Sequence, residues 1–450
     1  MEESSDPPFV EFYKNLFDTE GASNKNDDIG AFEDVEEWEV PLIDLSRLHQ
    51  GGWEGAECKR EIAEASQKWG FFQVINHGIS SDILEKMRCE QMKVFKKTFH
   101  EKADNHRNLN FPAGSYRWGT PSATCLRQLA WSEAFHVPLT DISNMGALTS
   151  LSSGNLDLRP VLDISTRKPA RFEGICTKQT QIDKVTSWKG QWIVSWLPGF
   201  ELRDEHAAIS RSWACHIVGC PLFADTLRTT TMDQFATMVS EVAENLAEIL
   251  AEQLGHKSDF FKENCWPSTC YLRMNRYPPC PVSSQVFGLM PHTDSDFLTI
   301  LHQDQIGGLQ LVKDGKWIAV KPNKEALIIN IGDLFQAWSN DVYKSVEHRV
   351  VANKQTERFS TAYFFCPSYD TMIQSCFENS IYRRFSFREF RQQVQDDVKR
   401  LGHKIGLPSY NMSNGHKCFD VKFHVKYVGL IGLTKKAWSH QNLTFLENHI

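Results

Sequence analysis

The sequence lacks several features that would place it in a specialised class of protein. No apolar run approaches the roughly 20 residues that a transmembrane helix needs. There is no block of basic residues, and the formal charge is −7 with a pI near 6.2, which argues against nucleic acid or an anionic membrane as the main partner. We therefore expect a cytoplasmic protein, with nuclear presence left open, that acts on neither a membrane nor a nucleic acid.

The signs of a secreted or zinc-stabilised domain are also missing. The first residues, MEESSDPPFVEF, are acidic and lack the basic and then apolar order of a signal peptide. In a reducing compartment we expect the 12 cysteines to be free thiols and not a disulfide framework. The cluster of Cys215, His216 and Cys220 has no second ligand pair at a usual distance, so we do not expect zinc there.

What is present is a globular composition, with 41% apolar and 23% charged residues in 450. Two of the predicted helices have end signals in the sequence. Ser81 or Asp82 can cap the first one. Thr231-x-x-Gln234 resembles a capping box at the start of the second one, and Gly255 is placed to end it. The predicted helices cover residues 57–69, 81–99, 232–254 and 385–400.

Between residues 270 and 367 the pattern changes to short strands separated by turns. A hairpin is predicted around Asp314-Gly315, a dipeptide typical of tight turns. These short strands favour a sandwich or barrel, of which a jelly roll is one form. The strands predicted here cover residues 271–277, 297–301, 309–312, 317–320, 326–331, 343–351 and 359–365, and earlier ones cover 40–45 and 71–76.

The motif His292-Thr293-Asp294 lies where an apolar strand gives way to a loop. In near-extended backbone, residues two apart project to the same side, so His292 and Asp294 can bind one ion. His348 lies in a later strand, where a polar ring between apolar neighbours needs a partner. Two histidines and one carboxylate leave three positions open on an octahedral metal, as in non-haem Fe(II) oxygenases.

Two further strands carry polar side chains. Arg358 and Ser360 are two residues apart on one strand, so they share a face. A buried guanidinium with a neighbouring hydroxyl is suited to binding a carboxylate. In the strand 271–277, Arg273, Asn275 and Tyr277 share one face. Periodicity alone does not show which face is inside, because both faces of this strand carry an arginine.

Four motifs in order now carry a resemblance: NRYPPC at 275–280, HTD at 292–294, the isolated His348 and RFS at 358–360. Together they resemble the plant 2-oxoglutarate- and Fe(II)-dependent dioxygenases. The resemblance implies a mainly β fold with flanking helices around a distorted double-stranded β-helix, or jelly roll. It also implies that His292, Asp294 and His348 bind Fe(II), that Arg358 and Ser360 hold the distal carboxylate of 2-oxoglutarate, and that Tyr277 and Asn275 position this cosubstrate.

Within that family the sequence is most similar to the gibberellin 2-oxidases that act on C20 gibberellins. The similarity rests on WSEAFHVPLTDIS at 131–143, HTDSDFLTILHQDQIGGLQLVKDGKWIAVKP at 292–322 and NIGDLFQAWSNDVYKSVEHRVV at 330–351. It implies a reaction in which O2 and 2-oxoglutarate are consumed with release of succinate and CO2, while the gibberellin is 2β-hydroxylated and inactivated. A dioxygenase acting on another plant small molecule, such as a flavonoid, remains an alternative.

A gibberellin is a rigid apolar skeleton that bears carboxylates, so its pocket should be apolar with at least one cation. Arg273 is the first candidate for that cation because it shares a face with Asn275 and Tyr277, and Arg117 is the second. Trp131, Phe135 and Phe364 are candidate walls of the pocket.

The resemblance covers residues 8–153 and 230–410 and leaves two stretches unexplained. We therefore divide the chain into an N-terminal region (1–153), an insertion expected to be poorly ordered (154–229), the jelly-roll domain (230–410) and a tail (411–450). The insertion can be an added lid or interaction element, a translated intron or a gene-model error. Its abrupt entry and lack of periodicity favour the last two. A folded but catalytically impaired binding protein is thus a further alternative.

Overall fold

The computed structural model describes residues 4–23, 35–104, 114–142, 185–188, 191–194, 221–256, 259–265 and 267–412. The chain divides into two units, one made of Met1–Asn144 with Thr231–Ile450 and the other of Met145–Thr230. Cys215, His216 and Cys220, and the tail from residue 413 onward, lie outside the described residues.

The smaller unit contains one described pair of strands. β6 (Val185–Trp188) pairs with β7 (Gln191–Val194) in antiparallel orientation. The rest of the predicted insertion up to residue 220 lies outside the described residues. The predicted division of the chain into four parts therefore stays a prediction.

Helices flank the strands in the larger unit, and no helix in the described part of the chain is long and apolar enough to cross a membrane. The α-helices are α1 (Phe9–Phe12), α2 (Lys14–Ser23), α3 (Gly52–Lys68), α4 (Ser81–Phe95), α5 (Phe99–Ala103), α9 (Pro221–Gln253), α10 (Asp259–Asn264), α11 (Asp333–Trp338) and α12 (Phe387–Leu401). Short 3-10 helices are η1 (Leu45–Gln50), η2 (Leu126–Gln128) and η4 (Leu407–Tyr410).

The predicted start of the helix over 232–254 and the predicted cap of the helix over 81–99 are wrong. α9 begins at Pro221, because proline is tolerated in a first turn and residues 222–231 contain no glycine or proline to stop the helix. Thr231 and Gln234 therefore lie inside the helix. α4 is capped by Ser80, whose hydroxyl accepts a hydrogen bond from the Ile83 N–H at 3.3 Å. Gly255 ends α9 as predicted, with a left-handed φ of 78°.

Except for residues 343–351, each predicted strand is present within two residues of its predicted bounds. Those not yet given are β1 (Glu37–Trp38), β2 (Leu42–Asp44), β3 (Phe71–Ile75), β4 (Tyr116–Trp118), β5 (Glu133–Pro138), β8 (Tyr271–Tyr277), β9 (Phe287–His292), β10 (Leu298–Gln303), β11 (Leu309–Lys313), β12 (Lys316–Val320), β13 (Leu327–Ile331), β14 (His348–Val351), β15 (Arg358–Phe365), β16 (Met372–Ile373) and β17 (Phe385–Ser386). The predicted turn at Asp314-Gly315 joins β11 to β12, with φ of 50° and 77° at its two residues.

The prediction of one strand over residues 343–351 is wrong in its first half, since β14 begins only at His348. The backbone N–H groups of Tyr343 and Ser345 donate to the side chains of Ser339 and Gln336, at 3.1 and 2.7 Å. These bonds continue the turn after α11 and occupy two N–H groups that a neighbouring strand would need. His348 is therefore the first residue of its strand.

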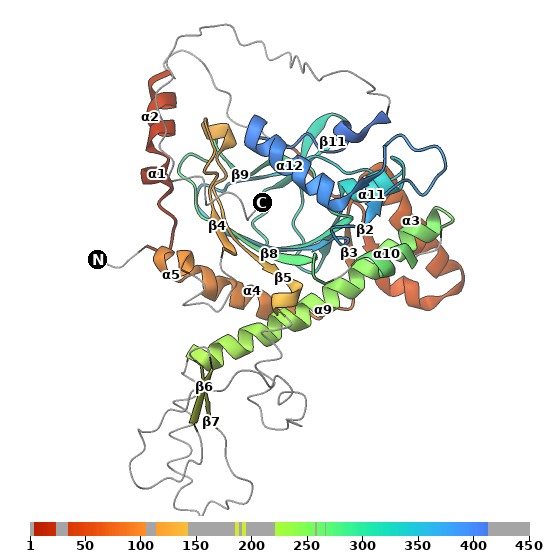
Figure 1. The fold of residues 1–450 in the computed structure, drawn as a ribbon, viewed down its shortest axis with the longest axis horizontal. Helices are drawn as coiled ribbons and strands as arrows, with labels where there is room; N and C mark the ends of the chain where they lie inside the picture. Colours follow the sequence, from red (N-terminus) through yellow and green to blue (C-terminus); the bar gives the residue numbers. More distant parts are fainter. Residues whose placement is uncertain are drawn as a thin grey trace, which may run out of the picture. The chain divides into compact units, whose positions relative to one another are not determined.

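Two sheets form the centre of the larger unit (Figure 1). The strand order of the eight-stranded sheet is β2-β3-β13-β10-β15-β8-β5-β4, and that of the five-stranded sheet is β1-β12-β11-β14-β9. A shared core joins them: Phe71, Tyr277, Leu301, Ile328 and Ala362 of the first sheet pack in one cluster with Leu309, Leu311, Ile318, Val320 and Val350 of the second. This arrangement of facing sheets agrees with the predicted jelly roll.

Strand register identifies the face of the large sheet that looks toward the small one. Residues directly opposite each other in neighbouring strands share a face. Ala362 and Tyr277 belong to the shared core, and their partners in the β15–β8 ladder are Arg273 and Arg358. Both arginines therefore lie on the inner face, whereas Arg276 lies on the outer face.

The outer face buries a charged network whose groups all have partners. The Lys102 Nζ donates to the Glu133 carboxylate at 2.6 Å, and both side chains are 0% exposed. Arg276 donates to Glu133 and Asp6 at 2.7 Å each and to Glu357 at 2.8 Å. The Glu133 carboxylate of β5 forms ion pairs with Lys102 of α5 and with Arg276 of β8. It therefore connects these two elements to β5.

We predict that Glu133→Gln lowers the free energy of unfolding by about 3–5 kcal/mol, because it leaves the buried Lys102 without its carboxylate and removes one of the three carboxylate partners of Arg276. Urea unfolding followed by circular dichroism measures the change. Glu39→Gln is the control, since Glu39 forms an exposed ion pair with Lys321, and exposed ion pairs contribute little to stability. Equal effects of the two variants would contradict the importance of the network.

Candidate metal and cosubstrate site

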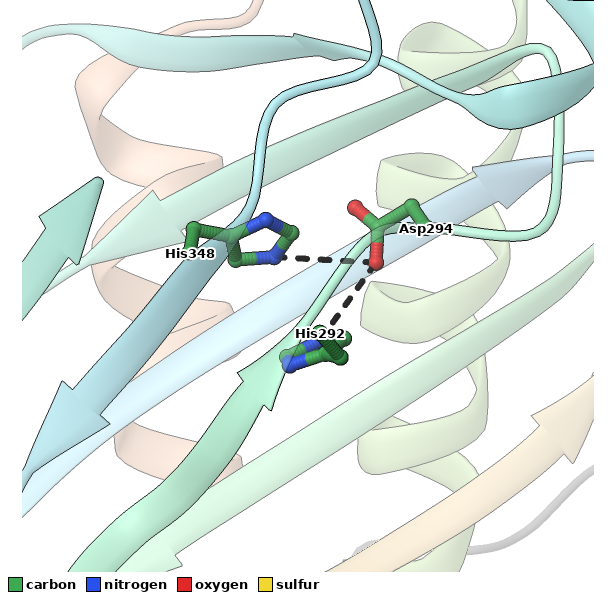
Figure 2. A group of neighbouring side chains, drawn as sticks. All are labelled: His292, Asp294 and His348. Carbon is green, nitrogen blue, oxygen red and sulfur yellow. Dashed lines mark ion pairs between the residues drawn. The ribbon is translucent and has the colours of Figure 1, made fainter. Parts of the chain in front are cut away.

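Three predicted ligands meet at one point between the two sheets (Figure 2). His292 ends β9, Asp294 lies in the loop that follows, and His348 begins β14. The pairing of β9 with β14 places His348 directly opposite His292. The Asp294 Oδ1 lies 3.6 Å from the His292 Nε2 and 3.7 Å from the His348 Nε2. One ligand atom from each residue lies within 4.8 Å of the other two, close enough for a single ion.

Backbone carbonyls determine how the two imidazoles are oriented. The His292 Nδ1 is 2.7 Å from the Met290 carbonyl oxygen, and the His348 Nδ1 is 3.1 Å from that of Val346. A carbonyl oxygen only accepts, so each Nδ1 carries the proton in the neutral ring. The lone pair of each Nε2 is then free on the side that faces Asp294, which is the state a metal requires.

Residues of two strands of the large sheet hold the Asp294 carboxylate through hydrogen bonds. Its Oδ2 accepts from the Thr299 hydroxyl at 2.7 Å and from the Asn330 amide at 3.0 Å. Burial raises the pKa of Asp294, but the two imidazoles and these hydrogen bonds outweigh burial and lower it to about 2. Burial, followed by the neighbouring His348, lowers the pKa of His292 to about 3. A carboxylate beside two imidazoles whose Nε2 atoms face it fits a divalent iron.

The loop between His292 and β10 is fixed by a lysine from the chain after α12. The Lys404 Nζ donates to the Thr293 carbonyl at 2.7 Å and to the Ser295 hydroxyl at 2.9 Å. It also forms an ion pair with Asp333 at 2.7 Å, in which both side chains are largely buried. Lys404 thus holds the residues on either side of Asp294.

The Arg358 guanidinium lies on the inner face, only 2% exposed, and has no carboxylate partner among the described residues. Its Nη2 donates to the Gln303 side chain at 2.6 Å, its Nη1 lies 3.5 Å from the Ser360 hydroxyl, and its Nε has no hydrogen-bond partner. The ring of Tyr277 lies 4.8 Å from it. A buried cation without a counter-charge is costly, so this position favours an anionic ligand.

Asn275 lies beside Arg358 on the inner face. Its amide donates to the Ser360 hydroxyl at 3.3 Å, and its Oδ1 is buried without a partner. The structure thus brings together all four residues predicted to hold the cosubstrate: Arg358, Ser360, Tyr277 and Asn275.

The five tentative substrate residues separate into two groups. Arg273 and Phe364 lie on the inner face of β8 and β15, and Arg117 shares that face through its pairing with Ala134, which is opposite Asn275. Phe135 points to the other face, where it packs on Phe95 and Tyr116.

Trp131 is likewise not brought to the inner face. It stacks on Phe9 at 4.4 Å, in a cluster with Leu126 and Cys280. We therefore withdraw Phe135 and Trp131 as candidate walls: β5 alternation puts Phe135 outside, and α1 covers Trp131.

Sequence reasoning missed several residues of the site. Buried polar residues within strongly apolar strands were the available signal for Thr299, Gln303 and Asn330. Lys404 gave no comparable signal, because its partners lie about 110 residues away in the chain.

Two family models match the chain. The 2OG-Fe(II) oxygenase superfamily matches residues 268–367, which contain all three candidate metal ligands. The N-terminal region of the non-haem dioxygenases in morphine synthesis matches residues 40–152. Both ranges fall within the two segments that carry the sequence resemblance.

Relatives and solved structures agree with these models. The chain is 51% identical to gibberellin 2-beta-dioxygenase 8 of Arabidopsis thaliana over 90% of this chain and 98% of the relative. It is 40% identical to gibberellin 2-beta-dioxygenase 6 of Oryza sativa subsp. japonica over 90% of this chain and 96% of the relative. The crystal structure of JOX2 in complex with 2OG, Fe and JA has a TM-score of 0.53 at 25% identity, covering 83% of this chain and 91% of that one.

A second solved structure, the dioxygenase for auxin oxidation in rice, has a TM-score of 0.55 at 22% identity, covering 83% of this chain and 100% of that one. Together with the two facing sheets, these likenesses confirm the predicted jelly-roll fold with flanking helices. The use of Fe(II) and 2-oxoglutarate, predicted from the sequence, is confirmed by the family model and the His-Asp-His group.

We predict that Lys404→Met weakens metal binding about 10-fold or more, because it removes an outer partner of the ligand loop. Titration of the apo protein with Co(II), followed by absorption, measures the affinity. Asp294→Ala should abolish the signal. Lys399→Met is the matched control, since Lys399 is an exposed lysine on α12. An unchanged Co(II) affinity in Lys404→Met would show that the loop holds its shape without this lysine.

Proposed function

Because this chain belongs to the gibberellin 2-beta-dioxygenases of the 2OG-Fe(II) oxygenase superfamily, we propose that it hydroxylates gibberellins at the 2β position and so inactivates them. A C20 gibberellin is the favoured substrate. The observation that carries the proposal is 51% identity extending over 98% of a relative with that name, combined with a complete His-Asp-His group. A cytoplasmic location is part of the same proposal.

Under this proposal the residues of the site have distinct roles. His292, Asp294 and His348 would hold Fe(II) through three ligand atoms and leave the other coordination positions to the cosubstrate and O2. The bound metal supplies the oxidation of an unactivated C–H bond, with 2-oxoglutarate as the co-reductant. The protein orients the substrate carbon and keeps the site dry, for which the apolar core between the sheets is suited.

Arg358 and Ser360 would bind the distal carboxylate of 2-oxoglutarate. The support is the buried guanidinium, whose Nε has no partner and which Gln303 holds from one side. Tyr277 would keep the guanidinium flat against its ring, and the free Oδ1 of Asn275 lies in the same area. A planar fork of donors matches a carboxylate better than an ammonium does.

We predict that Arg358→Lys raises the apparent KM for 2-oxoglutarate about 10- to 100-fold, because the two parallel hydrogen bonds of the fork are lost. Succinate formation at varied 2-oxoglutarate measures this change. Arg383→Lys is the control, because Arg383 also stacks on a tyrosine, Tyr410 at 4.5 Å, but is half exposed. An unchanged KM in Arg358→Lys would place the cosubstrate elsewhere.

The test of the function is an assay of the full chain with Fe(II), 2-oxoglutarate and either a C20 or a C19 gibberellin. We expect a 2β-hydroxylated product and an equal amount of succinate, with the C20 compound used faster. A flavonoid substrate in the same assay examines the alternative. Succinate formation with a flavonoid but with neither gibberellin would overturn the proposal.

The same assay should also include a variant without the insertion. Every described residue assigned to the site lies outside 145–230. A variant without 154–229 should therefore keep its metal and cosubstrate residues. Activity in this variant but not in the full chain would favour the alternative in which the insertion impairs catalysis.

A further inference from the structure

Strand β10 carries two polar side chains on the inner face, those of Thr299 and Gln303. In the β10–β15 ladder Thr299 is directly opposite Phe364, and Gln303 is opposite Ser360. Because opposite residues share a face, both side chains lie on the same face as Arg358. Thr299 is 3% exposed and Gln303 is 2% exposed. Polar groups buried this deeply in an apolar strand need hydrogen-bond partners.

These partners lie at the two ends of the candidate site. The Thr299 hydroxyl donates to the Oδ2 of Asp294 at 2.7 Å, and the Gln303 Oε1 accepts from the Arg358 Nη2 at 2.6 Å. β10 is paired with β13 on one side and with β15 on the other, so it cannot shift or stretch alone. The four residues from Thr299 to Gln303, roughly 13 Å of strand at about 3.3 Å per residue, thus set the spacing between the candidate metal ligand and the guanidinium.

Gln303 makes the shortest polar contact of the Arg358 guanidinium among the described residues. The contact with the Ser360 hydroxyl is longer, at 3.5 Å, and that hydroxyl also accepts from Asn275. The Tyr277 ring lies 4.8 Å from the guanidinium, but a ring contact depends little on where each N–H bond points. Gln303 is therefore the residue that sets the direction of the guanidinium.

A neutral amide suits this position. A guanidinium only donates hydrogen bonds, so the atom of Gln303 that meets Arg358 is the amide oxygen. An amide oxygen holds the guanidinium without cancelling its charge, whereas a carboxylate there would form a buried ion pair and compete with an anionic ligand. The Gln303 Nε2 and the Arg358 Nε are both buried without a partner. The pair thus keeps two donors for an incoming carboxylate.

We propose that Gln303 is a positioning residue that sets the reach of the cosubstrate site, so that the enzyme selects the five-carbon 2-oxoglutarate over its six-carbon homologue, 2-oxoadipate. The inference rests on the part of the proposed function in which Arg358 binds the distal carboxylate. It adds the residue that determines how far from the metal ligands this carboxylate lies. One additional methylene no longer matches a guanidinium that is held to β10 at a fixed distance from Asp294.

The test is anaerobic calorimetric titration of the Co(II)-loaded protein with 2-oxoglutarate and with 2-oxoadipate. We expect the wild-type protein to bind 2-oxoglutarate about 10- to 100-fold more tightly, the range for a hydrogen bond to a charged group. Gln303→Met keeps the length of the side chain and removes both of its polar groups. It should lower the preference about 10-fold, because the guanidinium is then free to follow the longer acid.

A second variant examines the charge. Gln303→Glu keeps the acceptor and adds a negative charge, so it should weaken the binding of both acids about 10- to 100-fold by pairing with Arg358. Titration with Co(II) should give the wild-type affinity in both variants, because Thr299 still holds Asp294. Thermal unfolding is measured alongside, since a merely structural role of Gln303 would lower the Tm and leave the preference unchanged.

Gln310→Met is the matched control. The Gln310 Oε1 accepts from the Arg349 Nε at 2.7 Å, and both side chains are largely buried. These residues are opposite each other in the β11–β14 ladder, and Gln310 alternates with Leu309 and Leu311 of the shared core. The pair therefore lies on the face of the small sheet that looks away from the site. Breaking this comparable bond should leave the preference unchanged.

A preference that falls in Gln303→Met and not in Gln310→Met supports the inference. A wild-type protein without a preference overturns it, and so does a folded Gln303→Met with the wild-type preference. If Gln303→Met does not fold, wild-type affinities in Gln303→Glu overturn it instead. The gibberellin assay is separate: a protein that shows the Gln303-dependent preference and hydroxylates no gibberellin overturns the proposed substrate and leaves this inference intact.

Discussion

The antiparallel pairing of β9 with β14 is the interaction on which the site depends. It places His348 directly opposite His292, so that both rings project to the same side with their centroids 4.3 Å apart. Asp294 then needs only to follow His292 by two residues to complete the group. A slip of one residue in this ladder would turn one ring to the other face of the sheet and remove a ligand.

The two faces of the large sheet differ in whether carboxylates pair with their buried cations. On the outer face Glu133 satisfies Lys102 and Arg276, and the result is a structural connection between elements. On the inner face Arg358 and Arg273 each retain a buried nitrogen without a partner. Since a buried cation without a counter-charge costs stability, these positions favour anionic ligands that complete the hydrogen bonds of the two arginines.

Much of the fold followed from local pattern. The strands β8, β10, β11, β12, β13 and β15, the Asp-Gly turn and the end of α9 at Gly255 were predicted because alternation and turn chemistry act over a few residues. The errors fall where distant or competing contacts decide. Tyr343 and Ser345 lie outside β14 because side chains of Ser339 and Gln336 take their N–H groups. α9 extends back to Pro221 because no residue there stops it.

The sequence by itself determined the class of chemistry: the order of motifs indicated the His-Asp-His group and the residues proposed to hold the cosubstrate, since each motif is short and local. Tertiary structure alone decided which side chains share the inner face. It placed Phe135 and Trp131 away from the inner face and brought Lys404 to the ligand loop. The reason is register, because which face a strand residue occupies depends on partners far away in the chain.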